Sequence, residues 1–216
     1  MRATAPAERH DGRVGPEVLI VLTEDEQPPR WAADWCCRSG RALRMQELAP
    51  RQRHSPPALL GQDVADLVGH PVLVVPRTPA RPPSPRVIAA IRDLPRDAAV
   101  LAAAEQAATH LGGDLVIVHG VPRSFAERSI GLTEALERGR DLLDLAAHQA
   151  SLAVPGLEVT RRLRRVHPYE LVRETFAAEL FVVGVPATRP LSGLDSVATS
   201  ALVGGHCPVL LVPKWP

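Results

Sequence analysis

The chain has 216 residues, 45% of them hydrophobic but only 3% aromatic, and a formal net charge of +1 from 25 basic and 24 acidic side chains. The length allows one large domain or two small ones with a core of Ala, Val and Leu, and the balanced charge argues against a general attraction to nucleic acid or membrane surfaces. No apolar run approaches the roughly 20 residues of a membrane span, and the N-terminus lacks the apolar segment of a signal peptide, so we expect a cytoplasmic protein with no membrane or nucleic-acid partner.

The start of the chain is expected to hold a tail, a strand, a helix and a second short strand. Residues 1–15 are charged and non-periodic, which predicts a disordered tail. Val18 to Leu22 is an apolar run typical of a buried strand. Apolar residues recur at helical spacing from Trp31 to Cys36, and a short strand is expected at 42–48 before a polar, proline-rich loop.

Two features of the first helix have both a functional and a structural interpretation. Trp31 and Trp35 could stack on a nucleobase, but packing in the core is the preferred interpretation. Cys36 and Cys37 could be redox-active, but adjacent cysteines rarely bridge each other and an odd total of three fits a reducing compartment. We therefore interpret both as small residues on the buried face of the helix.

An internal repeat divides the chain. The stretch LGQDVADLVGHPVLVVP at 60–76 is similar to LDSVATSALVGGHCPVLLVP at 194–213, which indicates a duplicated unit. We divide the chain into the tail at 1–15, a truncated first copy at 16–76, a proline-rich linker at 77–85 and a fuller second copy at 86–216. The first copy is too short for the middle helices and for one or more strands.

Strands and helices alternate along the second copy, which predicts an α/β fold with a parallel sheet and right-handed crossovers. The expected strands lie at 87–91, 114–119, 157–165, 180–183 and 208–212. The expected helices begin after an N-cap at Asp97, near Leu132, at Pro168, and at Asp195 or Ser196.

The segment at 179–213 carries a family resemblance. It reads as a buried strand that ends at Gly184, a loop, a short helix opened by Ser196, and a last strand that begins Cys207-Pro208-Val209-Leu210. It resembles the universal stress protein family, in which a Gly-x2-Gly-x9-Gly-Ser/Thr loop joins the corresponding strands. The resemblance implies a parallel five-stranded Rossmann-like sheet of order 3-2-1-4-5 flanked by helices, with a second, truncated copy of the same fold. It also implies an ATP site at the loop and ordinary packing for Cys207.

The loop departs from the family pattern at two glycine positions. Ala187 and Asp195 stand where the family has glycine, and the loop is about two residues short. A carboxylate about 4 Å from a phosphate, at an effective dielectric near 20, is repelled by roughly 4 kcal/mol, and the helix dipole returns only about 0.3–1 kcal/mol. The net loss of about 3 kcal/mol corresponds to roughly a hundredfold in affinity. The sequence therefore predicts weak ATP binding, with Asp195 a plain N-cap.

The first strand of the second copy ends in another departure. Family members continue with Val-Asp-Gly-Ser, whose Asp lies near the nucleotide, whereas this chain has Ile91-Arg92-Asp93-Leu94. Asp93 could replace that Asp after a shift of one residue, and Arg92 could itself contact a phosphate. The candidate ligand-binding residues are therefore Arg92, Asp93, Gly184, Ala187 and Ser196; the first copy offers no clear nucleotide site.

Other polar residues receive structural interpretations. Four arginines at 161, 162, 164 and 165 could bind nucleic acid or an acidic partner, but charge that protects an edge strand is preferred. His119 is interpreted as a strand-end residue rather than a ligand. The sequence has no spacing typical of a catalytic triad, a Cys/His pair or a metal site, so we expect neither catalysis nor a bound metal.

These patterns favour a protein that acts by binding or regulation in the stress response, with an eroded nucleotide site that binds ATP weakly or not at all. The alternative is an ATP- or AMP-binding stress sensor that uses the crevice of the second copy. No tightly bound cofactor is expected, and a protein partner is left unidentified. The last strands of the two copies, 71–75 and 208–212, are expected side by side as an intramolecular pseudo-dimer, with a homodimer as an open alternative.

Overall fold

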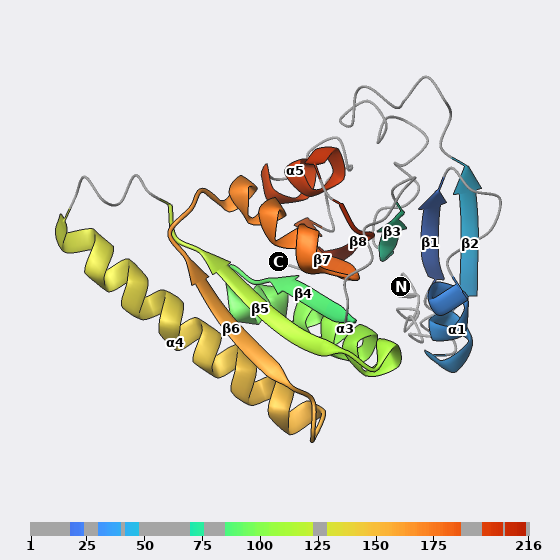
Figure 1. Ribbon diagram of the computed structural model, residues 1–216, viewed down its shortest axis with the longest axis horizontal. Helices are drawn as coiled ribbons and strands as arrows, with labels where there is room; N and C mark the ends of the chain where they lie inside the picture. Colours follow the sequence, from blue (N-terminus) through green and yellow to red (C-terminus); the bar gives the residue numbers. More distant parts are fainter. Residues whose placement is uncertain are drawn as a thin grey trace, which may run out of the picture.

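The computed structural model (Figure 1) describes residues 18–23, 30–39, 42–47, 70–75, 85–122, 129–186, 196–204 and 206–214. The tail predicted at 1–15 and almost all of the linker predicted at 77–85 lie outside these ranges. Most of the first repeated stretch also lies outside these ranges, and only its last strand is described.

The described elements share one eight-stranded sheet, in the order β2-β1-β3-β8-β7-β4-β5-β6 (Figure 1). The strands are β1 (Val18–Thr23), β2 (Ala42–Glu47), β3 (Val72–Val74), β4 (Arg86–Ala90), β5 (Asp114–Gly120), β6 (Val159–Arg164), β7 (Leu180–Pro186) and β8 (Val209–Lys214). The helices are α1 (Arg30–Ser39), α3 (Leu94–Leu111), α4 (Ser129–Ala153), the 3₁₀ helix η4 (Pro168–Ala177) and α5 (Ser196–Gly204). Each predicted strand and helix is present, with its ends shifted by a few residues.

Strands β4 to β8 form a parallel block in the order β6-β5-β4-β7-β8, which is the predicted 3-2-1-4-5 when counted from β4. Parallel neighbours require crossovers, and α3, α4, η4 and α5 lie within these connections. The crossover after β4 leads toward β5, whereas the crossover after β7 leads toward β8. A crevice therefore opens between the carboxyl ends of β4 and β7, as at the switch point of other α/β sheets.

The first part of the chain extends the same sheet. β1 pairs in parallel with both β2 and β3, and β3 pairs antiparallel with β8. The register places Leu73 opposite Leu210, which confirms that the last strands of the two repeated stretches lie side by side. β3 pairs directly with β1 in the sheet. In the second repeated stretch the last strand is β8, and β7 lies between it and β4. This pairing gives the exposed edge of β8 a partner within the chain.

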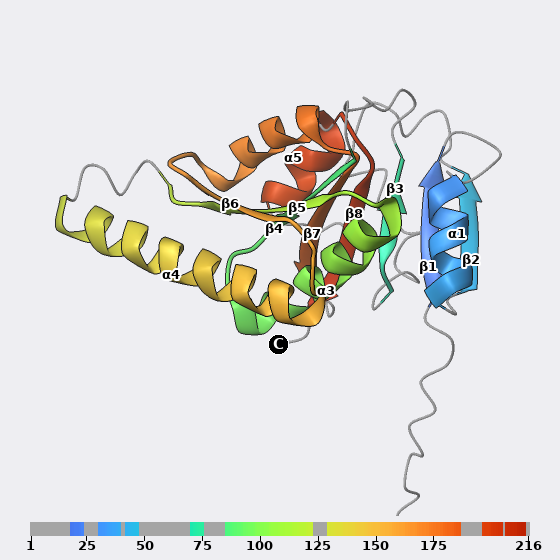
Figure 2. The same cartoon turned by 60° about the horizontal axis from the view of Figure 1, so that its bottom comes forward.

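The helices cover the two faces of the sheet unequally (Figure 2). α1, α3 and α4 share one core with the sheet, in which Trp35, Ala104 and Leu143 are buried. η4 and α5 cover the other face, through Leu171 and Ala198. Small Ala and Val side chains dominate both cores, as the low aromatic content predicts, and Trp31 and Trp35 stack on each other with ring centroids 6.3 Å apart.

The N-cap of helix α3 lies four residues before the predicted N-cap at Asp97. Its N-cap is Asp93, in an extended conformation with φ −149° and ψ 108°, and a proline follows within the first helical positions. Proline is tolerated there because its missing N–H would have no partner in the first turn. Gly112 caps the C-terminus of the helix: it adopts φ 62°, and its N–H donates to the carbonyl oxygens of Ala108 and Thr109.

The prediction that both adjacent cysteines are buried is wrong for one of them. Cys36 is buried in the core beneath α1, whereas Cys37 is exposed. Consecutive residues of an α-helix point about 100° apart, so Cys37 falls one step beyond the buried stripe that Ala32, Trp35 and Cys36 form. Cys207 is buried at the entry to β8, and burial raises the pKa of its thiol to about 12.

Candidate functional site

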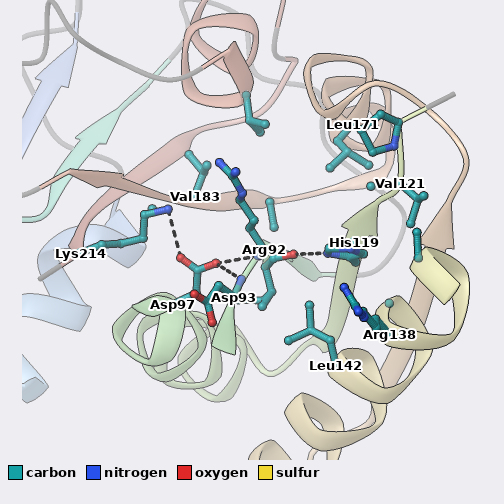
Figure 3. Close-up of a pocket in the computed structure, with 18 of the residues that line it drawn as sticks. Arg92, Asp93, Asp97, His119, Val121, Arg138, Leu142, Leu171, Val183 and Lys214 are labelled. Carbon is teal, nitrogen blue, oxygen red and sulfur yellow. Dashed lines mark hydrogen bonds and ion pairs between the residues drawn. The ribbon is translucent and has the colours of Figure 1, made fainter. Parts of the chain in front are cut away.

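A pocket of about 820 Å³ lies at the carboxyl ends of β4, β5 and β7, in the crevice predicted by the strand order (Figure 3). α4 forms one wall, and η4 and α5 contribute Leu171 and Val197. Its volume falls within the range typical of small-molecule sites. The polar side chains that line it are Arg92, Asp93, Asp97, His119, Glu134, Arg138 and Lys214.

Asp97 lies at the base of the pocket and is almost fully buried. Its Oδ2 accepts hydrogen bonds from the backbone N–H groups of Arg92 at 2.6 Å and Asp93 at 3.0 Å. Its Oδ1 lies 3.1 Å from Nζ of Lys214, an ion pair that offsets the cost of burying the carboxylate. Asp97 therefore ties the loop after β4 to the end of β8, which are far apart in the sequence.

Gly184 belongs to strand β7, where the sequence placed it at the strand's end. The pairing of β7 with β8 continues past Gly184 to Pro186, opposite Lys214, so the strand does not end where the apolar run does. The Lys214 side chain lies over Gly184: a Cβ added there would be 2.3 Å from Cδ of Lys214. The absence of a side chain at Gly184 makes room for the lysine stem.

Arg92 and Asp93 stand at the mouth of the pocket and are exposed. Figure 3 shows the Arg92 side chain extended away from Asp97 toward β7, while its backbone N–H is held by Asp97. Asp93 forms an exposed ion pair with Arg96 at 3.7 Å, and Arg138 pairs with Glu134 on α4. Of the two arginines and one lysine in the described pocket lining, Arg92 is the one for which no carboxylate partner is found.

His119 lines the pocket at the end of β5, although the sequence suggested only a strand-end role. Its Nδ1 lies 2.8 Å from the carbonyl oxygen of Ile91, so Nδ1 carries the proton and donates this bond. Gly139 of α4 packs against it: a Cβ there would lie 3.1 Å from Cδ2 of His119 and 2.7 Å from Cδ1 of Leu163. This close approach positions α4 as a wall of the pocket.

The structure brings together three of the five candidate residues named from the sequence, because Arg92, Asp93 and Gly184 all line the pocket. Ala187, like Asp195, lies outside the described residues. Ser196 is the first residue of α5, and its side chain is outside the described part.

Sequence reasoning missed Asp97 and Lys214 as pocket residues. Asp97 was interpreted as an N-cap, because an Asp just before an apolar pattern of helical spacing is typical of a helix N-terminus. The available signal for Lys214 was compositional, since it is the single lysine of the chain.

Among the described strands, the arginine-rich β6 lies at one edge of the sheet and pairs only with β5. Arg161 pairs with Asp144 of α4. This placement supports the edge-strand interpretation. Within the described ranges, no group of three or more His, Cys, Asp or Glu residues could hold a metal ion, and no helix is long and apolar enough to cross a membrane.

The sequence model of the universal stress protein family matches residues 84–213, more than half of the chain. The chain belongs to this family. The match covers every strand of the parallel block around the pocket, and Lys214 lies immediately beyond it. The comparison with curated proteins gave no match.

Solved structures share the fold of the chain. A universal stress protein from Archaeoglobus fulgidus DSM 4304 is 16% identical, with a TM-score of 0.53, covering 93% of this chain and 87% of that one. The functionally unknown protein PA1789 from Pseudomonas aeruginosa PAO1 is 18% identical, with a TM-score of 0.51, covering 91% of this chain and 82% of that one. UspA from Lactobacillus plantarum is 11% identical, with a TM-score of 0.50, covering 60% of this chain and 97% of that one. At these identities the likeness concerns the fold alone.

Proposed function

We propose that this universal stress protein acts in the stress response by binding and regulation rather than catalysis, and that its nucleotide site is eroded and takes ATP weakly or not at all. A small ligand other than a nucleoside triphosphate would occupy the pocket at the ends of β4, β5 and β7. No catalytic nucleophile or base is assigned to the pocket.

The observation that carries this proposal is the Lys214 side chain lying over Gly184. A glycine in a phosphate loop serves by letting the backbone approach the phosphate closely. Here that face of Gly184 is covered by lysine methylenes, and the family's Asp is replaced by Arg92. The covered glycine and the replaced Asp both support a site that no longer recognises a triphosphate in the way typical of the family.

A second candidate is an ATP- or AMP-binding stress sensor. The pocket's position and its volume of about 820 Å³ favour a ligand of nucleotide size, and the exposed Arg92 favours an anionic one. Mass spectrometry of small molecules released from the purified protein separates the two candidates, because a stoichiometric nucleotide supports the sensor.

The domain division is also a proposal. Residues 16–76 would be a truncated copy of the fold and 86–216 a fuller copy, joined by a linker at 77–85 after a tail at 1–15. The antiparallel pairing of β3 with β8 supports an intramolecular pseudo-dimer. We further propose a cytoplasmic location, no nucleic-acid or membrane partner, and a protein partner whose identity is open; a homodimer would use other surfaces.

ATP should bind with a dissociation constant above roughly 100 µM, taking a micromolar site weakened by about 3 kcal/mol. Asp195→Gly should tighten ATP binding more than the matched Ala187→Gly, because it removes a charge as well as restoring a glycine. Calorimetry of the unmodified protein and both variants measures this. Micromolar or tighter binding of ATP by the unmodified protein would contradict the proposal.

A further inference from the structure

Two cations reach the same pocket from different elements. Arg92 follows β4 and Lys214 ends β8, and both line the cavity. In Figure 3 the Arg92 guanidinium and the Lys214 ammonium both lie toward Val183 in β7. An anion placed over this part of β7 could contact both groups.

Contacts with Gly184 and Asp97 fix the position of the Lys214 side chain. Its side chain is 19% exposed, its stem crosses Gly184, and its Nζ lies 3.1 Å from Asp97 Oδ1. An ammonium has three N–H donors, so the pair with Asp97 leaves donors for a ligand. Asp97 is itself fixed by two backbone N–H groups, which limits the positions open to the ammonium.

We propose that Arg92 and Lys214 form a two-cation subsite that holds one phosphate-sized anionic group of a small ligand. The inference rests on the proposed function of this pocket as a ligand site. In this subsite the anionic group would be bound by side-chain cations rather than by backbone N–H groups. The lysine stem covers the backbone at Gly184, and the Lys214 ammonium supplies the hydrogen-bond donor instead.

The charge of the lining favours a ligand with one anionic group. Three basic side chains face three carboxylates, and two of the three bases already have carboxylate partners. Further phosphates would meet the carboxylates of Asp93 and Glu134, which also line the pocket. The opposite wall is apolar and suits the uncharged body of the ligand; its members are Val121, Pro122, Ala135, Leu142 and Leu171.

Calorimetry with AMP, adenosine and ATP tests the subsite in the full chain. AMP and adenosine share a body and differ in one phosphate, so AMP should bind at least about tenfold more tightly if the two cations hold that phosphate. ATP should bind at least about tenfold more weakly than AMP, because its additional phosphates face carboxylates.

Three variants test which side chains contact the anionic group of the ligand. Lys214→Met and Arg92→Gln should each weaken AMP about tenfold and leave adenosine unchanged. Gly184→Ala retains every charge but displaces the lysine stem, and should also weaken AMP. Arg140→Gln, an exposed α4 arginine outside the pocket lining, is the matched control and should change neither ligand.

The single lysine allows a direct spectroscopic readout. Incorporation of lysine labelled with ¹⁵N at Nζ labels Lys214 and keeps its three N–H donors; the Lys214→Met variant identifies the lysine signal. AMP should shift that signal and adenosine should not.

The possible outcomes separate this inference from the proposed function. Absence of AMP binding, or AMP binding that both cation variants leave unchanged, overturns the two-cation subsite while weak ATP binding still stands. ATP binding as tight as AMP overturns the single-anion preference. If Lys214→Met fails to fold because Asp97 loses its partner, Gly184→Ala and the lysine signal still decide the question.

Discussion

Asp97 shows how one side chain can join distant parts of this fold. A buried carboxylate is tolerated only if hydrogen bonds and a cation compensate for lost hydration, and here two backbone N–H groups and Lys214 do so. The same contacts define the edge of the pocket. The stability of the fold and the shape of the pocket therefore depend on shared residues.

Asp97→Ala should lower the free energy of unfolding by about 2–4 kcal/mol. The change leaves two backbone N–H groups and the largely buried Lys214 without their acceptor. The expected loss of unfolding free energy is smaller than for a fully buried pair, because Lys214 retains some contact with water. Urea unfolding measures the loss. Asp93→Ala is the control: its carboxylate makes an exposed ion pair and no capping hydrogen bond, so it should cost less than about 1 kcal/mol.

The three cysteines should react with a thiol reagent at very different rates. Cys37 is exposed, whereas Cys36 and Cys207 are buried and the pKa of Cys207 is raised to about 12. The thiolate is the reactive form. At pH 8 the native protein should therefore show one fast thiol with Ellman's reagent, and Cys37→Ser should abolish that phase. Two fast thiols in the native protein would contradict the assigned burial.

The strand pair β3 and β8 joins the two repeated stretches. β3 has three residues, yet it contacts β1 on one side and β8 on the other. A strand this short is stabilised mainly by the packing of its side chains, and Leu73 is fully buried in the same core as α1 and α3. The first part of the chain thus shares a continuous core with the second.

Leu73→Ala should destabilise the chain by about 2–5 kcal/mol, as expected for a buried leucine whose removal leaves a cavity. Leu210→Ala should cost a similar amount, because the two residues face each other in the register and share a core. Leu152→Ala, at a position 68% exposed on α4, is the control and should change the free energy of unfolding by less than about 0.5 kcal/mol. A negligible effect of Leu73→Ala would mean that β3 is not integral to the core.

The described part of the chain is built on a single sheet with a pocket at the carboxyl ends of β4, β5 and β7, and most of its elements were predictable. Apolar runs such as Leu180 to Val183 and the alternation of strands with helices are local signals, so their pattern indicates a parallel α/β sheet. The family resemblance added the strand order and the crevice. The repeat predicted that β3 and β8 lie together, which the register confirms.

Only the tertiary structure decided which side chains meet at the pocket. Lys214 and Asp97 are distant in sequence and no local pattern links them, because their contact depends on β8 lying beside β7 and on a glycine that makes room for the lysine stem. The exposure of Cys37 likewise depends on how α1 is rotated against the core. Sequence periodicity determines the elements because it reflects local geometry, whereas ion pairs and pocket walls arise where elements converge. The sequence therefore identified Arg92 and Gly184 but not Lys214, whose stem lies over that glycine.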